Sequence, residues 1–381
     1  MIFKLSCKVS VAFCRTIRDE NGLCCTIFCL GGHISPIFSK LFQKLLGVFS
    51  AWCKIRRNHV EVLTVTIDTL FDNALLNQEI GGYVYAIIEN ETATIKTAGQ
   101  ASPELAMSEN LHFDIASLSK LVVTTRIMQL VEDEEIDLDT PVLDILESFR
   151  IAHITVEDLL LHRSGFNPSV SKKYLESKQL IKTSIMHAYD WQEVNYHTMT
   201  YSCINFIILG WIIEALDGSL DHSLNEHVLK PLGMHDTTFN PVSTPLIVPS
   251  EIHPTRGLIC GTVHDETAAS LDGISGNAGL FSTIHDLIAF TNGYLQKTIL
   301  TPETIDIMVD TNQELRSLGW NLHLYEGQPY LFHTGFTGPA IIMDLNRGRA
   351  LIILTNRTFP SRSNTAFIET RLKIYDAFLG M

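Results

Sequence analysis

The spacing of apolar and polar positions changes along the chain and predicts different elements in turn. Apolar residues at helical spacing predict an amphipathic helix over residues 67–75. Two β-branched runs, Tyr83–Ile88 and Thr92–Ala98, flank the turn at Asn90–Glu91, and their alternation predicts a β-hairpin. Residues 120–300 then carry mostly helical spacing and loop residues, so we expect a long helical segment after the hairpin.

The carboxyl-terminal part returns to short apolar or alternating runs separated by turn residues. The predicted strands are residues 319–325, 330–334, 339–344 and 350–355, and a final helix covers 364–379. Strands at both ends with helices between them predict an α+β fold. We expect one antiparallel sheet of about five strands, built from both chain ends and flanked by helices, with a mostly helical insert. The active site would lie between the sheet and the insert.

Ser117 and Lys120 stand where a short apolar run meets a long amphipathic helix. Three residues apart on a helix, they lie on one face and their side chains can meet. Unpaired N–H groups at the first helical turn favour developing negative charge, so the pair has the Ser-x-x-Lys arrangement of acyl-transfer enzymes. The alternative is a helix cap beside a surface lysine. Ser169 and Lys172 have the same spacing, but their polar stretch contains glycine and proline and predicts a loop.

Two later stretches are candidates for the same site. Tyr201 and Cys203 begin an apolar helix, and a tyrosine aimed into a site can relay the proton of a serine where positive charge favours its phenolate. The alternative is a tyrosine of the core or rim. The second stretch, His333–Gly338, ends a predicted strand, and its glycines would let the backbone of a ligand approach closely. The N–H of Phe336 could form an oxyanion hole with that of Ser117, and the alternative is a glycine-bearing edge strand.

The composition is ordinary for a globular enzyme, with 46% hydrophobic and 18% charged residues. The net charge of −14 disfavours a nucleic-acid partner, because phosphate binding needs a basic surface. The chain lacks a His-Glu-x-x-His pair, a Walker-type phosphate loop and a Gly-x-Ser-x-Gly elbow. We therefore expect no metal and no cofactor.

The first sixty residues differ from the rest in charge and in cysteine content. Residues 1–59 are basic, although the chain as a whole is acidic, and they hold most of the cysteines without Cys-x-x-Cys pairing. The uncharged run 21–39 is interrupted by glycine and proline, which weakens its interpretation as a membrane span. We expect residues 1–63 to lie outside the catalytic fold of residues 64–381, as a poorly ordered extension or an upstream start wrongly included. The alternative is a weak membrane or interface anchor.

The two cysteines that remain, Cys203 and Cys260, are far apart in the sequence. Distant free thiols fit a reducing compartment without a disulfide framework, which predicts a cytoplasmic protein. Association with the cell envelope is the alternative.

Taken together, Ser117-x-x-Lys120, Tyr201 and His333-Thr334-Gly335 occur in the order and at the separations of a known pattern. The chain resembles the serine β-lactamase and penicillin-binding protein superfamily, in particular its class C-like, esterase and DD-peptidase branch. The resemblance covers roughly residues 64–379. Further stretches that look like this family are residues 159–166, 231–234, 263–265, 276–283 and 354–357.

The resemblance implies a double-displacement hydrolase of amides or esters. Ser117 would attack a carbonyl, with Lys120 and Tyr201 as the base system. The N–H groups of Ser117 and Phe336 would hold the oxyanion. His333 would hydrogen-bond near Tyr201 or a substrate carboxylate, and Thr334 and Gly335 would line the strand beside the substrate.

Two positions depart from the family pattern. Cys203 stands where the family usually has Asn or Asp, so a polar group that positions the lysine or the substrate amide is missing. Asn205 is about half a turn further around the helix and is a poor replacement. Asn277 stands where close relatives carry His. A neutral histidine at 333, in place of lysine, also weakens any claim to efficient β-lactam hydrolysis.

The leading hypothesis is a serine acyl hydrolase whose partner is a small-molecule or peptide substrate, such as a D-alanyl peptide, a β-lactam-like compound or a small ester. The alternative is a catalytically weak or inactive binding protein on the same fold, which captures cell-wall fragments or a protein partner. Cys203 favours the alternative. The joint presence of Ser117, Lys120, Tyr201 and His333 favours the enzyme.

Overall fold

The computed structural model describes residues 12–18, 24–30, 66–241 and 246–381. The chain divides into two compact units, Met1–Thr64 and Val65–Met381, and each is described by itself. In the first unit, strands β1 (Ala12–Arg18) and β2 (Cys24–Leu30) form an antiparallel hairpin. The anchor and extension hypotheses for residues 1–63 fall mostly outside the described residues and stay predictions.

The second unit is built on one antiparallel sheet of seven strands, in the order β11-β12-β13-β14-β3-β4-β5. The prediction of an α+β fold with a sheet from both chain ends is confirmed, but the expected count of about five strands is too low. The strands are β3 (Gly82–Glu89), β4 (Thr92–Ser102), β5 (Leu105–Ala106), β11 (Asn321–Tyr325), β12 (Gln328–Thr334), β13 (Ala340–Asp344) and β14 (Arg349–Thr355).

The predicted hairpin is present as β3 and β4, whose last pair is Glu89 with Thr92. The two turn residues, Asn90 and Glu91, both have positive φ, at 49° and 63°. Two left-handed residues match the twist of a two-residue hairpin, so this short turn sets the register of the pair. Strand β14 pairs with the other edge of β3, which joins the two chain ends in the middle of the sheet.

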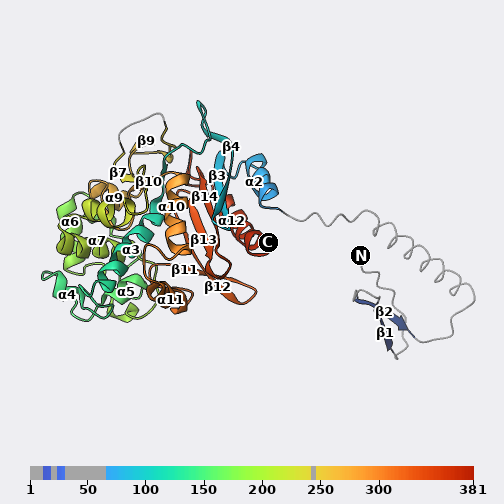
Figure 1. The fold of residues 1–381 in the computed structure, drawn as a ribbon, viewed down its shortest axis with the longest axis horizontal. Coiled ribbons are helices and arrows are strands. Elements are labelled where there is room, and N and C mark those ends of the chain that lie inside the picture. Colours follow the sequence, from blue (N-terminus) through green and yellow to red (C-terminus); the bar gives the residue numbers. More distant parts are fainter. Residues whose placement is uncertain (1–11, 19–23, 31–65, 242–245) are drawn as a thin grey trace, which may run out of the picture. The chain divides into compact units, whose positions relative to one another are not determined.

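Alternate residues of the central strands pack against different layers. Tyr83 and Tyr85 lie in a cluster with helices α2 (Ile67–Leu76) and α12 (Ala366–Leu379). The intervening residues of β3 belong to the larger core, which includes α10 (Ile284–Leu295) and the helical insert. Figure 1 shows α10 on one face of the sheet and α2 with α12 on the other. The sheet is therefore buried on both faces.

The helical insert surrounds α7 (Cys203–Asp217), which contacts α3 (Ser119–Glu132) and α5 (Val156–Leu160). Within the described part of the chain no single helix is long and apolar enough to cross a membrane. Taken together, α7 and the bent segment Leu220–Leu229 have the length and apolar composition of a membrane span, by these two criteria only. The other helices are α4 (Val142–Ile145), α6 (Lys178–Met186), α8 (Leu220–Leu224), α9 (Glu266–Ser270) and α11 (Pro302–Asp310).

A small antiparallel sheet of strands β6 (Phe113–Asp114), β10 (Leu280–Ser282) and β7 (Thr238–Phe239) lies next to the start of α3. The pair β8 (Glu251–His253) and β9 (Gly257–Ile259) forms a separate hairpin. Strand β6 leads directly into the segment that carries Ser117, so this small sheet fixes where the candidate nucleophile begins.

Candidate active site

Ser117 lies in a short 3-10 turn, Ala116–Leu118, that joins β6 to α3. The sequence predicted the first turn of the long helix, but α3 itself begins at Ser119. The difference arises at Ala116, whose φ of 46° is left-handed and interrupts regular helix. Such strain in a non-glycine residue persists only where surrounding contacts hold it, and it often marks a functional segment.

Lys120 is fully buried and its Nζ donates to Ser117 Oγ at 2.9 Å and to the backbone oxygen of Asn277 at 2.7 Å. The predicted meeting of the serine and lysine side chains is therefore present. Burial lowers the pKa of Lys120, but Cys203 and Tyr201, when ionised, raise it more, and the net shift is upward. Lys120 is consequently an ammonium group at neutral pH that holds the hydroxyl of Ser117.

Tyr201 directly precedes α7, whose first turn is capped by Ser202. The ammonium of Lys120 lies 5.4 Å from the centroid of the tyrosine ring, and the guanidinium carbon of Arg316 lies 5.0 Å from it. The phenol of Tyr201 is also among the groups whose charge and hydrogen bonding stabilise charged Lys120. Both cations therefore lie close to the phenol that the motif assigns as the acceptor of the Ser117 proton.

Cys203 is the first residue of α7 and lies beside Lys120, as the motif predicts. Burial raises the pKa of its thiol, and Lys120 only partly offsets this. Asn205 points elsewhere, because its Oδ1 accepts from Ser164 Oγ at 2.6 Å. The expectation that Asn205 does not replace the missing amide at 203 agrees with this contact.

His333 is 1% exposed, and its Nδ1 lies 3.1 Å from the backbone oxygen of Thr334. Burial lowers its pKa well below the usual value, and Lys120 and Arg316 lower it further, so the ring is neutral. Its Nε2 is buried and has no partner among the described residues. Since Nδ1 donates to a carbonyl, Nε2 is the free acceptor of the ring. The ring lies 6.4 Å from that of Tyr201, which agrees with the predicted neighbourhood.

His162 is a second histidine against Tyr201, with ring centroids 4.5 Å apart. Its Nδ1 accepts from the backbone N–H of Ser202 at 3.1 Å, which fixes the start of α7 beside the site. Burial lowers its pKa well below the usual value, so it is also neutral. The sequence favoured a structural role for this histidine, and the Ser202 contact supports that role.

Gly335 and Phe336 follow β12 and lie against the nucleophile segment. A side chain at Gly335 would meet the carbonyl oxygen of Ile115 at 2.7 Å, so this glycine admits the protein's own backbone. The expectation that the backbone of a ligand also approaches here stays a prediction. Arg357 donates to the carbonyl oxygen of Phe336 and orients its peptide. Within the described residues the backbone N–H groups of Ser117 and Phe336 donate to no protein acceptor, which leaves both for an oxyanion.

Arg316 is the functional candidate that the sequence did not reveal. It lies in the segment before β11, where its guanidinium faces Tyr201 and hydrogen-bonds the side chain of Asn321. Among the described residues no carboxylate forms an ion pair with it. Burial lowers its pKa, but an arginine remains charged at neutral pH. No motif or periodicity marks this position, because only the fold brings its loop to the end of α7.

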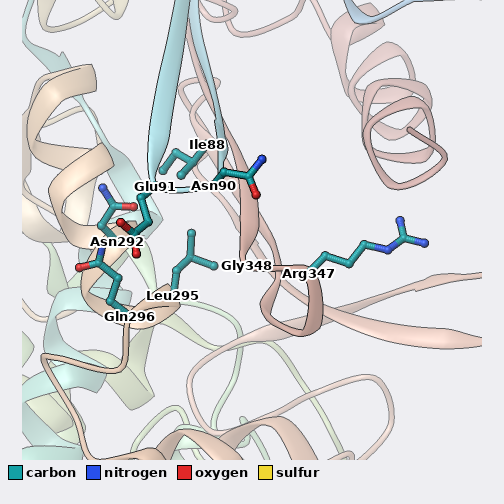
Figure 2. Close-up of a pocket in the computed structure, with 8 residues that line it drawn as sticks. All are labelled: Ile88, Asn90, Glu91, Asn292, Leu295, Gln296, Arg347 and Gly348. Carbon is teal, nitrogen blue, oxygen red and sulfur yellow. The ribbon is translucent and has the colours of Figure 1, made fainter.

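The second Ser-x-x-Lys match and the cleft found in the structure both lie outside the site around Ser117. Ser169 is exposed in a loop, as predicted, and Lys172 is exposed as well. Residues 66–241 and 246–381 hold no cluster of metal-ligating side chains. A cleft of about 360 Å³ lies at the β3–β4 turn and the end of α10, and Figure 2 shows Leu295 and its neighbours there with Arg347 pointing away. None of the predicted site residues lines this cleft.

Similarity to known proteins extends over most of the chain. The Beta-lactamase family model matches residues 67–373. The chain belongs to the beta-lactamase family. A relative named putative D-alanyl-D-alanine carboxypeptidase, from Salmonella agona, is 28% identical over 353 residues, covering 77% of this chain and 78% of the relative. The family resemblance drawn from the sequence is therefore confirmed, and this beta-lactamase-family chain is a serine hydrolase of amide or ester bonds.

Solved structures share the same fold. A class C beta-lactamase from Rhodobacter sphaeroides has a TM-score of 0.68 at 18% identity, covering 83% of this chain and 99% of that one. A D-amino acid amidase from Ochrobactrum anthropi has a TM-score of 0.67 at 22% identity, covering 83% and 99%. At these identities the similarity establishes the beta-lactamase fold and no more.

Proposed function

We propose that this chain hydrolyses an amide or ester next to a substrate carboxylate, as in a peptide that ends in D-alanine. The single observation that carries the proposal is Arg316, a cation at Tyr201 with no carboxylate partner in the described part of the chain. An arginine left without an anion beside a nucleophile provides planar, paired donors for a carboxylate. The name of the Salmonella agona relative supports the same substrate class.

His333 has a different role from the lysine that usually occupies its position. Because burial keeps its ring neutral, it cannot supply the positive charge that meets a carboxylate. The sequence alone predicts that this cation is simply missing, whereas Arg316 supplies a charge near the same strand. With Nδ1 committed to Thr334, the free Nε2 of His333 accepts a hydrogen bond from the substrate or from Tyr201.

The proposed reaction has two steps. Lys120 holds Ser117 Oγ, and Tyr201 accepts the serine proton as Ser117 attacks the carbonyl carbon. The N–H groups of Ser117 and Phe336 stabilise the oxyanion while the leaving group takes the proton from Tyr201. Water then attacks the acyl-enzyme by the reverse relay, which restores Ser117 and releases the acid.

The test is the intact mass of the full-length chain after incubation with a fluorophosphonate and, separately, with a penicillin. We expect a single adduct on the peptide that contains Ser117. The variant S117A should remain folded and unlabelled, and the matched control S169A should be labelled like the wild type. Labelling of S117A equal to the wild type would refute the assignment. No adduct on the folded wild type would refute the hydrolase and favour a binding protein in which Cys203 has replaced a catalytic amide.

A further inference from the structure

Asp114 is a buried carboxyl group three residues before Ser117, and the reaction proposed above makes no direct use of it. It ends β6 and is 3% exposed. No basic side chain forms an ion pair with it within residues 66–241 and 246–381. A buried carboxylate is costly unless each oxygen is hydrogen-bonded, so its partners should explain why the fold keeps it.

The two carboxylate oxygens of Asp114 bind two different segments. Oδ1 accepts the backbone N–H of Ala116 at 2.8 Å, and Oδ2 accepts that of His264 at 2.7 Å. Ala116 is the left-handed residue immediately before Ser117. The carboxylate therefore holds the strained turn in the conformation that aims the Oγ and the N–H of Ser117.

The backbone of Asp114 binds a third segment. Its carbonyl oxygen accepts the hydroxyl of Thr337 at 2.7 Å, and Thr337 follows Phe336 directly in the chain. The same residue thus contacts the segments that carry both candidate oxyanion donors, Ser117 and Phe336. The close approach of Gly335 to Ile115 already brings these backbones together. Asp114, the residue before Ile115, adds the bond from Thr337, two residues after Gly335.

We propose that Asp114, in its ionised form, is a positioning residue that holds the two oxyanion N–H donors in register. The inference rests on the proposed function, since it deepens the account of the same site. Protonation of the carboxyl would leave one oxygen a weaker acceptor, and the turn at Ala116 would lose part of its support. Acylation of Ser117 should therefore depend on the charge of a residue that touches neither substrate nor Ser117.

The environment of Asp114 sets the pH at which this dependence should appear. Burial raises its pKa to about 6, although the N–H groups of His264 and Ala116 oppose the shift. The charged groups that face it are Asp265, which raises the pKa further, and Arg256, which lowers it. The ring of His264 is turned to Glu251 instead, with Nε2 2.9 Å from Oε2. The rate of acylation should therefore rise with pH through about 6.

The experiment measures the rate of fluorophosphonate labelling of Ser117 from pH 5 to pH 9 in the full-length chain. In D114N one acceptor oxygen becomes a donor, so we expect the rate to fall by about 10²-fold at pH 8, as for a misplaced reacting group. The rise in labelling rate with pH near 6 should be absent in D114N. The matched control is D286N, because Asp286 is also a buried carboxylate away from the site. It accepts hydrogen bonds from the backbone N–H of Asp236 and from the hydroxyl of Thr237.

The outcomes separate the two proposals. A wild type that is never labelled refutes the proposed function itself. A labelled wild type whose rate and pH profile are shared by D114N refutes the role of Asp114, and an equal loss in D286N does so as well. If D114N does not fold, the variant T337V tests the proposal instead, because it removes only the hydroxyl hydrogen bond to the Asp114 carbonyl. We expect T337V to lower the labelling rate of Ser117 and to leave the midpoint of its pH profile unchanged. A T337V rate equal to the wild type would overturn the inference.

Discussion

Replacing Arg316 by methionine should remove the preference for a substrate carboxylate. Methionine keeps an unbranched apolar stem of similar length but has no charge, so the change isolates the guanidinium. The guanidinium lies 5.0 Å from the Tyr201 ring and has no carboxylate partner among the described residues. A substrate carboxylate that reaches the nucleophile would therefore find an uncommitted cation.

The expected size of the effect follows from the partial burial of Arg316. Two unit charges about 4 Å apart interact by about 4 kcal/mol at the effective dielectric constant typical near a protein surface. Loss of one partner of a fully buried charge pair costs about 2–5 kcal/mol in binding studies, and Arg316 is only partly buried. We therefore expect R316M to lose about 2 kcal/mol of transition-state stabilisation for the carboxylate substrate, which is about 30-fold in kcat/KM.

The assay compares two peptides, one ending in D-alanine with a free carboxylate and one with the matching carboxamide. The wild type should prefer the carboxylate by about 30-fold, and R316M should lose that preference by slowing only the carboxylate reaction. The control is R150M, because Arg150 is exposed and outside the site. If R316M slows both peptides equally, Arg316 acts through Tyr201 and does not bind the carboxylate. A wild type without any preference would refute the reasoning directly.

Three further predictions concern the base system and the buried carboxyl. C203N should raise the labelling rate of Ser117 by about 10-fold, because the amide oxygen accepts a stronger hydrogen bond from the charged Lys120 than the thiol does; an unchanged rate means that an amide at position 203 does not assist acylation. Y201F should lower the same rate by about 10²-fold through loss of the proton acceptor, and normal labelling would exclude Tyr201 from that role. The third prediction is thermodynamic. The pKa of Asp114, about 6 when folded against 3.8 ordinarily, means that the folded chain keeps a proton which the unfolded chain releases between these values. The unfolding free energy should therefore fall by about 3 kcal/mol, relative to D114N, as the pH rises through this window. Urea denaturation of both proteins measures this, and parallel pH dependence would contradict it.

Much of the fold is predictable because it depends on local pattern. The hairpin turn at Asn90 and Glu91 follows from two residues that tolerate left-handed φ between alternating runs. The carboxyl-terminal strands lie within a few residues of their predicted bounds, since alternation and turn residues mark them. Six of the seven strands match predicted runs, so the expected count of about five is low even against those runs. The seventh strand, β5, has only two residues, Leu105–Ala106, and forms by pairing with the irregular end of β4. So short a strand has no periodic signal of its own.

The candidate site is predictable only as far as its residues lie in motifs. The contact of Ser117 with Lys120 is encoded by helical spacing, and the order of the motifs along the chain is sufficient to indicate the family. The geometry of Ser117 is not encoded in this way, because the left-handed Ala116 before it is hydrogen-bonded to a carboxylate that also binds the distant His264 segment. Its position in a 3-10 turn therefore differs from the helical prediction.

By itself, then, the sequence determined the elements, the motif residues and the family of this protein, because those depend on neighbours in the chain. Only the tertiary structure decided which charges surround the nucleophile. Arg316 and the backbone oxygen of Asn277 reach the site from loops far away in the sequence, and the neutral state of His333 results from burial between elements. Burial and long-range electrostatics depend on packing that no local pattern records, and they decide how the site can react.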